Sequence, residues 1–406
     1  MTPGTARGGA SRARRRWLHR LLLVVAGLTV AFVLAEIGLR LAGVHLPRRS
    51  QRDEHRGTAI RPGIEFHFDD EGGALVRINT AGFRDREWEV PKPPGTFRIA
   101  VLGDSYVDAW QVSVEERFTE RLGAALHASG HFSPFNVEVL NFGVGGYGTA
   151  QELQVLRYSV WKYSPDLVIL AFLPYNDLRN NYEPLEKDPG RPYFVLKDGK
   201  LVLDDSFLST PDHEKTLIER IGLGLVDHSR VFQLAYRARA KLRKLLEASK
   251  KPPMAAGDLL TEVGLDDKAF AEPSDADWRE AWDVSERLIL ATRDEVKAHG
   301  SEFLLVVVTS GHQVHPNPKP RAEFMNKLGV KDLFYAEDRL LDFGRKEGVR
   351  TLALGRPFQE HAEKTRTVLH GFPNAFLGLG HWNAAGHELA AQLIAEEILK
   401  MAPGGR

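Results

Sequence analysis

Four residues of this chain are of types that could act together in nucleophilic catalysis: Ser105, Gly146, Asn176 and His381. A serine hydroxyl is a poor nucleophile until a base removes its proton, and histidine is the usual base near neutral pH. Attack on an acyl carbon also creates an oxyanion, which fixed N–H donors stabilise. The backbone N–H groups of Ser105 and Gly146 and the side-chain amide of Asn176 would supply three donors. The pattern indicates Ser105 as nucleophile and His381 as its base.

These residues follow predicted strands or precede a predicted helix. Short apolar runs predict buried strands at 98–103, 137–140, 166–172, 303–308 and 348–354. Amphipathic stretches predict helices at 115–128, 151–163, 278–299 and 384–401. Alternating strands and helices favour the α/β class, with a parallel sheet covered by helices on both faces. The carboxyl ends of parallel strands share one edge of the sheet, so residues far apart in sequence can converge there.

Four sequence blocks occur in the order of the SGNH (GDSL) hydrolase family, which the chain resembles over roughly residues 75–400. The blocks are Gly103-Asp104-Ser105, the stretch from Asn141 to Gly146, Asn176-Asp177, and the stretch from His381 to His387. The resemblance implies a flavodoxin-like three-layer α/β/α fold, ester hydrolysis through acyl-Ser105, and an oxyanion site made by Ser105, Gly146 and Asn176. Within this family, the chain resembles the bacterial members that are held by an N-terminal membrane segment.

The acid that orients the histidine in this family is missing from its usual place. The family has Asp two or three residues before the histidine, and this chain has Gly378 and Leu379 there. Three interpretations stay open: a backbone carbonyl orients His381, an acid from elsewhere reaches it, or the enzyme is weakened or inactive. Sequence-level candidates for a distant acid are Glu337, Asp338 and Glu360.

Four further residues flank the blocks or follow a strand and are candidates to line the substrate site, with core packing as the alternative role. They are Tyr147, Tyr175, His312 and Trp382. His312 and His315 lack an evident third ligand, so we expect no metal and no cofactor.

The expected activity is that of an esterase or O-deacetylase on an acylated carbohydrate or lipid. The alternatives are an O-acyltransferase with the same machinery and a non-catalytic, membrane-tethered polysaccharide-binding protein. Because Lys+Arg and Asp+Glu balance at 54 each, no basic surface field argues for nucleic acid. The chain has no cysteine, which excludes disulfides and thiol nucleophiles.

The N-terminus predicts a membrane segment. Arginines crowd residues 1–20 and an apolar stretch follows, with Glu36 and Arg40 spaced to pair on a helix. We expect a basic cytoplasmic tail at 1–16 and a single-pass signal-anchor at 17–44 in the inner membrane. The positive-inside rule then places the catalytic domain outside the cytoplasm. The alternative is a signal peptide cleaved after Ala35.

The remaining chain divides into a stalk and lead-in at 45–95 and a hydrolase domain at 96–402. An insertion at about 180–277 interrupts the strand and helix alternation of this domain. Within it, Asp198-Gly199 between two apolar runs predicts a hairpin, and 213–250 is largely helical and basic at its end.

Overall fold

The computed structural model describes residues 7–210, 216–249, 262 and 264–401. These residues form two compact units. The larger unit takes in the described parts of 49–214 and 253–406, and the smaller takes in those of 1–48 and 215–252. The larger unit contains all four of the predicted chemical residues.

A parallel five-stranded sheet forms the centre of the larger unit. Its strands are β5 (Thr96–Gly103), β6 (Asn136–Asn141), β7 (Leu167–Phe172), β10 (Glu302–Val307) and β11 (Thr351–Ala353). Their spatial order is β11-β10-β7-β5-β6, and every neighbouring pair is parallel. Counted along the chain this is order 2-1-3-4-5, the flavodoxin-like arrangement, so the predicted fold class is confirmed.

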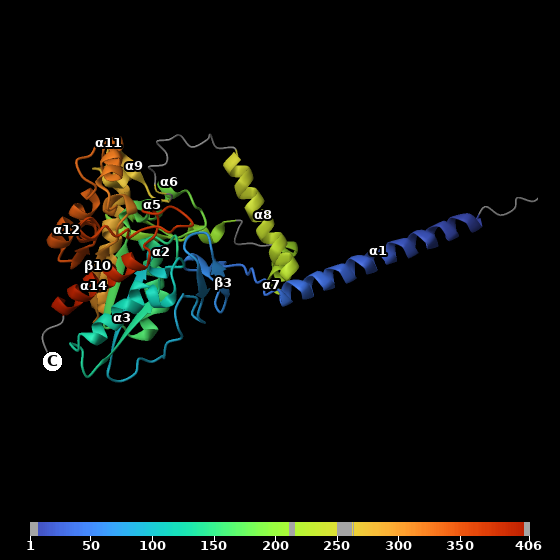
Figure 1. The fold of residues 1–406 in the computed structure, drawn as a ribbon, viewed down its shortest axis with the longest axis horizontal. Coiled ribbons are helices and arrows are strands. Elements are labelled where there is room, and N and C mark those ends of the chain that lie inside the picture. The colour runs from blue at the N-terminus through green and yellow to red at the C-terminus, as the bar shows by residue number, and fades with distance from the viewer. Residues whose placement is uncertain (1–6, 211–215, 250–261, 263, 402–406) are drawn as a thin grey trace, which may run out of the picture. The chain divides into compact units, whose positions relative to one another are not determined.

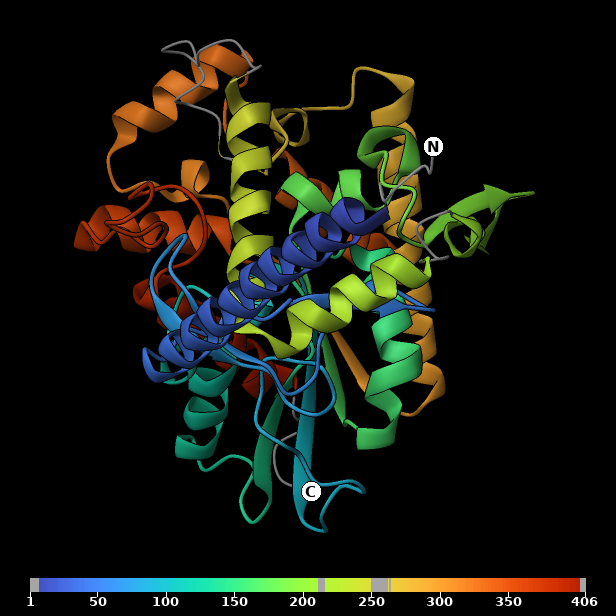
Figure 2. The same cartoon turned by 90° about the vertical axis from the view of Figure 1, so that its right-hand side faces the viewer.

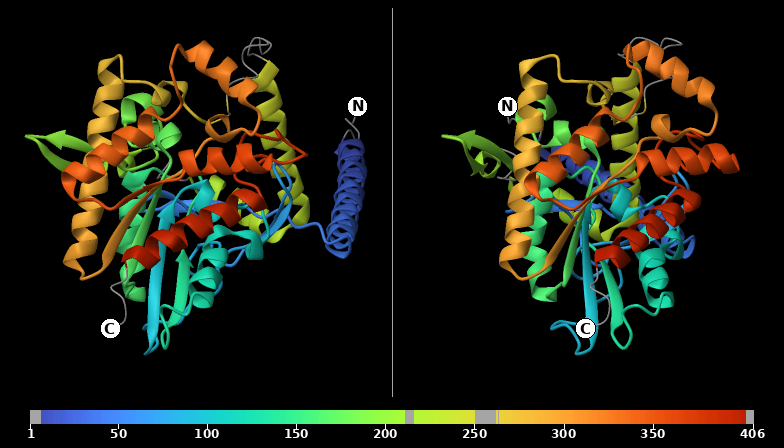
Figure 3. Two further views of the ribbon diagram at one scale, coloured as in Figure 1. Left: turned by 60° about the vertical axis from the view of Figure 1, so that its left-hand side comes forward. Right: turned by 90° about the vertical axis from the view of Figure 1, so that its left-hand side faces the viewer.

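Helices cover both faces of this sheet. The longer ones are α3 (Phe118–Ala128), α4 (Thr149–Val155), α9 (Ala276–Ala298), α11 (Pro318–Leu328), α12 (Tyr335–Glu347), α13 (Gly355–Thr365) and α14 (Ala384–Met401). The shorter ones are α2 (Ser105–Asp108), α5 (Pro174–Asn180), α6 (Glu183–Glu186) and α10 (Gly311–Val314). Helices α3 and α14 pack together on one face, and α4 and α9 lie on the other (Figures 1 and 3).

The sequence of the central strands explains their burial. All six residues of β7 are buried, and Ile99, Val101 and Leu102 of β5 are fully inaccessible. A strand covered on both faces cannot alternate polar and apolar residues, so continuous apolar runs form the middle of the sheet. Single 3₁₀ or π turns connect some elements, at Val114–Glu116, Leu156–Val160, Trp161–Tyr163, Ser206–Ser209 and Asp267–Phe270.

Much of the segment predicted as stalk and lead-in belongs to the larger unit and folds as two antiparallel hairpins. The first pairs β1 (Ser50–Asp53) with β2 (Gly57–Ile60), and the second pairs β3 (Glu65–Phe68) with β4 (Ala74–Arg77). Buried residues such as Phe66 and Val76 attach this segment to the core, which a stalk would not do.

The hairpin predicted around Asp198-Gly199 is present. Strand β8 (Tyr193–Lys197) pairs with β9 (Lys200–Asp204), and both turn residues have positive φ, as a tight two-residue turn requires. In Figure 2 the hairpin projects beside α9, with which both of its strands are in contact.

The smaller unit contains three helices: α1 (Arg7–Leu41), α7 (Leu217–His228) and α8 (Arg230–Ser249). Residues 14–41 of α1 are long and apolar enough to cross a membrane, and a signal sequence near an N-terminus has the same character. The predicted Glu36–Arg40 pair is present, with 2.7 Å between Oε1 and Nη2.

Candidate active site

Ser105 lies at the sharp turn between β5 and α2. The strand ends at Gly103, and Ser105 is the first residue of the short helix. Asp104 caps this helix, because its Oδ1 accepts a hydrogen bond of 2.9 Å from the backbone N–H of Tyr106. The strand order reverses between β5 and β7, and open α/β sheets bind their ligands at such a point. The serine hydroxyl therefore stands at the expected ligand-binding edge.

His381 joins Ser105 to a carboxylate. Its Nε2 lies 2.8 Å from the Ser105 hydroxyl, and its Nδ1 lies 2.5 Å from Oε2 of Glu71. The other oxygen of Glu71 accepts the backbone N–H of His381 at 2.9 Å. With Nδ1 held as the donor to Glu71, Nε2 is left to accept the serine proton. Hydrogen bonds thus link the three side chains in the order serine, histidine, carboxylate, which is the connectivity that a nucleophile, a base and an orienting acid require.

The acid comes from a part of the chain that the sequence did not point to. Glu71 lies in the turn between β3 and β4, and Asn374 holds this turn through bonds to the N–H (3.0 Å) and the C=O (2.7 Å) of Gly72. The sequence distance from Glu71 to His381 is 310 residues, and no local pattern links them. An acidic, glycine-ended turn at 69–73 was the only available signal.

The three acids proposed from the sequence do not serve His381. Glu337 is buried and accepts a hydrogen bond from Gln313, whereas Asp338 pairs with Arg356. Glu360 lies on α13. The β3–β4 hairpin that carries Glu71 lies within the segment predicted as stalk and lead-in.

The contact between Glu71 and His381 shifts both pKa values. Burial alone would lower the pKa of His381, but the hydrogen bond and charge of Glu71, with Asp104 and Asp108 nearby, raise it above 6.5. Burial would raise the pKa of Glu71, and the hydrogen bonds and charge of His381 lower it. The pair thus favours an ionised carboxylate that stabilises a positive imidazolium.

The three predicted oxyanion donors meet at one cavity. A hollow of about 270 Å³ is lined by Ser105, Gly146, Asn176 and His381 among others. The Asn176 amide donates one N–H to Oδ2 of Asp104 at 3.1 Å, which fixes its orientation and leaves its second N–H available. Among the described residues, the backbone N–H groups of Ser105 and Gly146 donate to no other protein group. All three donors are free to bind an oxyanion.

The loop after β6 is held by Asn141 at the end of that strand and by Asp108 of α2. Oδ1 of Asn141 accepts the N–H of Gly143 at 2.9 Å, and Oδ2 of Asp108 accepts the N–H of Gly145 at 2.6 Å. Burial raises the pKa of Asp108 to about 7. Gly146 has φ of +79°, and a Cβ there would meet nothing within 4 Å. This positive φ is a backbone conformation that favours glycine.

The loop that carries His381 is held by buried groups. Gly380 donates its N–H to Glu262 at 2.7 Å, and its C=O accepts from Nδ1 of His370 and from the Tyr106 hydroxyl, at 2.7 and 3.1 Å. Burial lowers the pKa of His370 to about 3, so this ring stays neutral. Burial raises the pKa of Glu262 to about 7. The side chains of Glu262, His370 and Tyr106 therefore satisfy the N–H and C=O groups of Gly380, the residue before His381.

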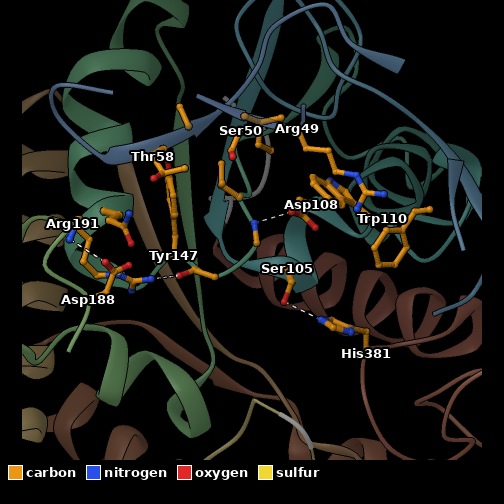
Figure 4. Close-up of a pocket in the computed structure, with 18 of the residues that line it drawn as sticks. Arg49, Ser50, Thr58, Ser105, Asp108, Trp110, Tyr147, Asp188, Arg191 and His381 are labelled. Atoms are coloured by element: carbon orange, nitrogen blue, oxygen red, sulfur yellow. Dashed lines mark hydrogen bonds and ion pairs between the residues drawn. The ribbon is translucent and has the colours of Figure 1, made fainter. Parts of the chain in front are cut away.

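A larger cavity of about 510 Å³ opens beside Ser105 and His381 (Figure 4). Its wall includes Arg49, Thr58, Phe68, Trp110, Tyr147 and Arg191. Hairpin β1–β2 contributes to this wall through Ser50 and Thr58, and Arg191 donates to the C=O of Gly146 at 3.1 Å. The site thus depends on residues that flank the central sheet as well as on the sheet edge.

Of the four residues proposed to line the substrate site, only Tyr147 lines this cavity, and its hydroxyl donates to the C=O of Thr58. Tyr175, His312 and Trp382 are 0%, 3% and 1% exposed and lie among core aromatic rings. The prediction that they line the site is wrong, because their side chains fill the interior instead.

No protein-family model and no curated protein matches the chain. Solved structures are similar to it. A lipase/acylhydrolase from Enterococcus faecalis shares 14% identity, with 77% of this chain and 100% of that chain covered and a TM-score of 0.37. A catalytic mutant of an acetylxylan esterase from Geobacillus stearothermophilus shares 12%, covering 77% and 96%, with a TM-score of 0.36.

A GDSL-like lipase from Bacteroides thetaiotaomicron shares 11% identity, covering 75% of this chain and 89% of that chain, with a TM-score of 0.32. These proteins are acylhydrolases, lipases and esterases by name. The name GDSL also denotes the family that the four sequence blocks resemble.

Proposed function

We propose that the protein is a serine esterase of the SGNH type that works through an acyl-Ser105 intermediate. The observation that carries this proposal is the unbroken hydrogen-bonded chain from Ser105 through His381 to Glu71. The chain opens onto a cavity at which three N–H donors converge. This arrangement supplies a nucleophile, a base, an acid that steadies the base, and an oxyanion site.

In the first half of the reaction, Ser105 Oγ attacks the acyl carbon while Nε2 of His381 takes its proton. The ionised carboxylate of Glu71 stabilises the imidazolium that forms. The N–H groups of Ser105, Gly146 and Asn176 hold the oxyanion of the tetrahedral intermediate. When the intermediate collapses, the C–O bond to the leaving alcohol breaks and Nε2 returns the proton to the alcohol oxygen.

The second half repeats these roles with water in place of serine. Nε2 of His381 takes a proton from a water molecule, which attacks the acyl-Ser105 carbonyl. The second tetrahedral intermediate is held by the same donors. Its collapse releases the carboxylic acid and returns the proton to Ser105 Oγ.

The proposed substrate is an ester on a carbohydrate. The cavity of about 510 Å³ carries the aromatic side chains of Trp110 and Tyr147 beside the polar side chains of Arg49, Gln151 and Arg191. Aromatic faces with hydrogen-bonding groups suit a sugar ring better than a long lipid chain, which needs a wholly apolar channel.

The site is proposed to face the periplasm or the cell exterior. Helix α1 is long and apolar enough to span the inner membrane, and the arginines at its start favour a cytoplasmic N-terminus. A phosphatase reporter fused after residue 401 is expected to be active only if this end lies outside the cytoplasm. A cytoplasmic fluorescent reporter at the same point should then stay dark.

The experiment that tests the reaction uses a fluorophosphonate probe and p-nitrophenyl acetate. We expect the wild type to be labelled and to hydrolyse the ester, and Ser105→Ala to lose both properties. Ser209→Ala, an exposed serine outside the site, is the matched control and should behave as wild type. Hydrolysis that persists unchanged in folded Ser105→Ala would overturn the proposal.

The same acyl-enzyme could pass its acyl group to an alcohol, and the two outcomes differ only in the acceptor. Measuring both products in the presence of a carbohydrate acceptor distinguishes the two activities. A transferase forms acylated sugar faster than free acid, and a hydrolase does the reverse. The non-catalytic alternative drew its support from the lack of an acid near His381, and Glu71 removes that support.

A further inference from the structure

Helix α7 exposes an apolar stripe. Leu217, Ile218, Ile221 and Leu225 fall within one 100° sector of the helix and are 72%, 82%, 57% and 44% exposed. A soluble surface helix normally turns such residues inward, and here only Val226 is buried. An apolar surface of this kind is expected to be covered by an apolar partner or by lipid.

Helix α8 has a second apolar stripe of the same kind. Leu234, Ala238, Leu242 and Leu245 are spaced i, i+4, i+8 and i+11, which places them on one side of the helix. All four are exposed. Leu242 and Leu245 are each 58% exposed, as much as side chains of the membrane segment such as Leu34 at 64%.

The rest of α8 is strongly basic. The helix carries six cationic side chains against a single acid, Glu247: Arg230, Arg237, Arg239, Lys241, Arg243 and Lys244. Arg239 and Lys241 lie on the two borders of the apolar stripe and are exposed. A basic helix with one apolar side is the pattern of helices that lie in the plane of an anionic membrane surface.

The hairpin of α7 and α8 is fastened to the C-terminal end of α1. The carboxylate of Glu36 accepts hydrogen bonds from the Ser229 hydroxyl (2.8 Å) and from the N–H groups of Arg230 and Val231 (3.1 and 3.2 Å). Arg40 donates to the C=O of His228 at 2.8 Å. These bonds hold the junction of the two helices at the point where α1 would leave a bilayer.

We propose that the α7–α8 hairpin is a membrane-interface element, bound in the headgroup layer of an anionic bilayer on the side where α1 emerges. The apolar stripes insert among the upper acyl chains, and the Arg and Lys side chains bind phosphates. The proposal rests on α1 spanning the membrane and not on the esterase reaction. It gives residues 217–249 a role separate from the catalytic site.

The test uses the full chain in lipid nanodiscs. Because the chain has no cysteine, Leu242→Cys and Ala240→Cys each place one environment-sensitive fluorophore on α8. The two positions are 160° apart around the helix, and both are exposed. A fluorophore at Val30→Cys in α1 reports whether the anchor is inserted. Each label is challenged with a doxyl quencher on the lipid and with iodide in the water.

In discs containing phosphatidylglycerol we expect lipid-borne quenching at position 242 to be several-fold stronger than at position 240, with iodide showing the reverse. Arg239→Gln with Lys241→Gln should reduce the lipid-borne quenching at position 242, as should high salt. Circular dichroism checks that each variant keeps its helices.

Two results would overturn the proposal while position 30 remains quenched by lipid. Equal iodide access at 242 and 240 would show a solvated helix. Protection at 242 from both quenchers would show a protein partner, either another copy or another part of this chain.

Discussion

The two halves of the proposed catalytic chain are positioned in different ways. Ser105, Gly146 and Asn176 follow β5, β6 and β7, which are neighbours in the sheet, so the parallel topology brings them together. His381 and Glu71 come from loops outside the sheet, joined to each other across 310 residues. The placement of Ser105, Gly146 and Asn176, the serine half, depends on strand order. The placement of His381 and Glu71, the histidine half, depends on loop packing.

Both halves nevertheless use the same device to fix a backbone N–H. On the serine side Asp108 accepts the N–H of Gly145, next to Gly146, and on the histidine side Glu262 accepts the N–H of Gly380, next to His381. Burial raises the pKa of each carboxyl to about 7. The halves therefore differ in how their elements are placed and not in how these backbone N–H groups are held.

The sharpest way to test the histidine half is Glu71→Gln. Glutamine keeps the size of the side chain but removes the charge that stabilises imidazolium. We expect kcat/KM on p-nitrophenyl acetate to fall by about 10²–10⁴-fold. The lower bound is a small contribution of general base catalysis to the rate, and the upper bound is the loss caused by neutralising the orienting acid of a triad. Asp70→Asn, an exposed acid in the same turn, is the matched control and should stay within about twofold.

The same variant also predicts a change in pH dependence. Activity requires neutral His381, so it falls as pH drops through the pKa of this group, which Glu71 holds above 6.5. Without the carboxylate the pKa falls, and the acid limb of kcat/KM moves to lower pH. An unchanged limb together with wild-type activity would mean that Glu71 is not the partner of the base.

The serine half is tested by Asn176→Ala. Removing this amide deletes one of three oxyanion donors, so kcat should fall by about 10²–10³-fold with little change in KM. Asn326→Ala removes an exposed amide on α11 and serves as the control. A rise in KM at unchanged kcat would place Asn176 in substrate binding instead.

The contrast between the halves also explains what the sequence could predict. Residues at strand ends are predictable, because a continuous apolar run followed by glycine marks both the strand and its edge, as in β5 and Ser105. Glu71 was not predictable, because its pairing with His381 is set by how two short hairpins and a C-terminal loop pack. Tyr175, His312 and Trp382 were misplaced for a related reason: proximity in sequence to a functional block does not say which way a side chain points.

A smaller effect is expected from Asn374→Ala, which releases the turn that carries Glu71 and leaves the acid itself in place. We expect kcat to fall by roughly 3- to 30-fold, below the hundredfold that a 1 Å displacement can cost. In the Glu71→Gln background the substitution should add little, since the two act through the same contact. If the double variant instead loses activity by the product of the two single fold-changes, Asn374 and Glu71 act independently and the proposed coupling is wrong.

The smallest effect on activity is expected from Glu262→Gln, which tests whether a buried carboxylate holds the His381 loop. At pH 8 the glutamine oxygen still accepts an N–H, so activity should stay near that of the wild type. Stability should differ with pH instead. A carboxyl whose pKa is about 7 when folded and about 4.3 when unfolded binds its proton more tightly in the folded state. Wild-type stability relative to the variant should therefore fall by up to about 3 kcal/mol as pH rises across this window.

Chemical denaturation in detergent micelles, followed by tryptophan fluorescence from pH 4.5 to 8, measures this difference. Asp70→Asn, which replaces an exposed carboxylate in the Glu71 turn, is the matched control. A flat difference for Glu262→Gln would mean that the carboxylate is solvated and does not hold the loop. Then the histidine half would rest on His370, Tyr106 and Asn374, and the parallel with Asp108 on the serine side would fail.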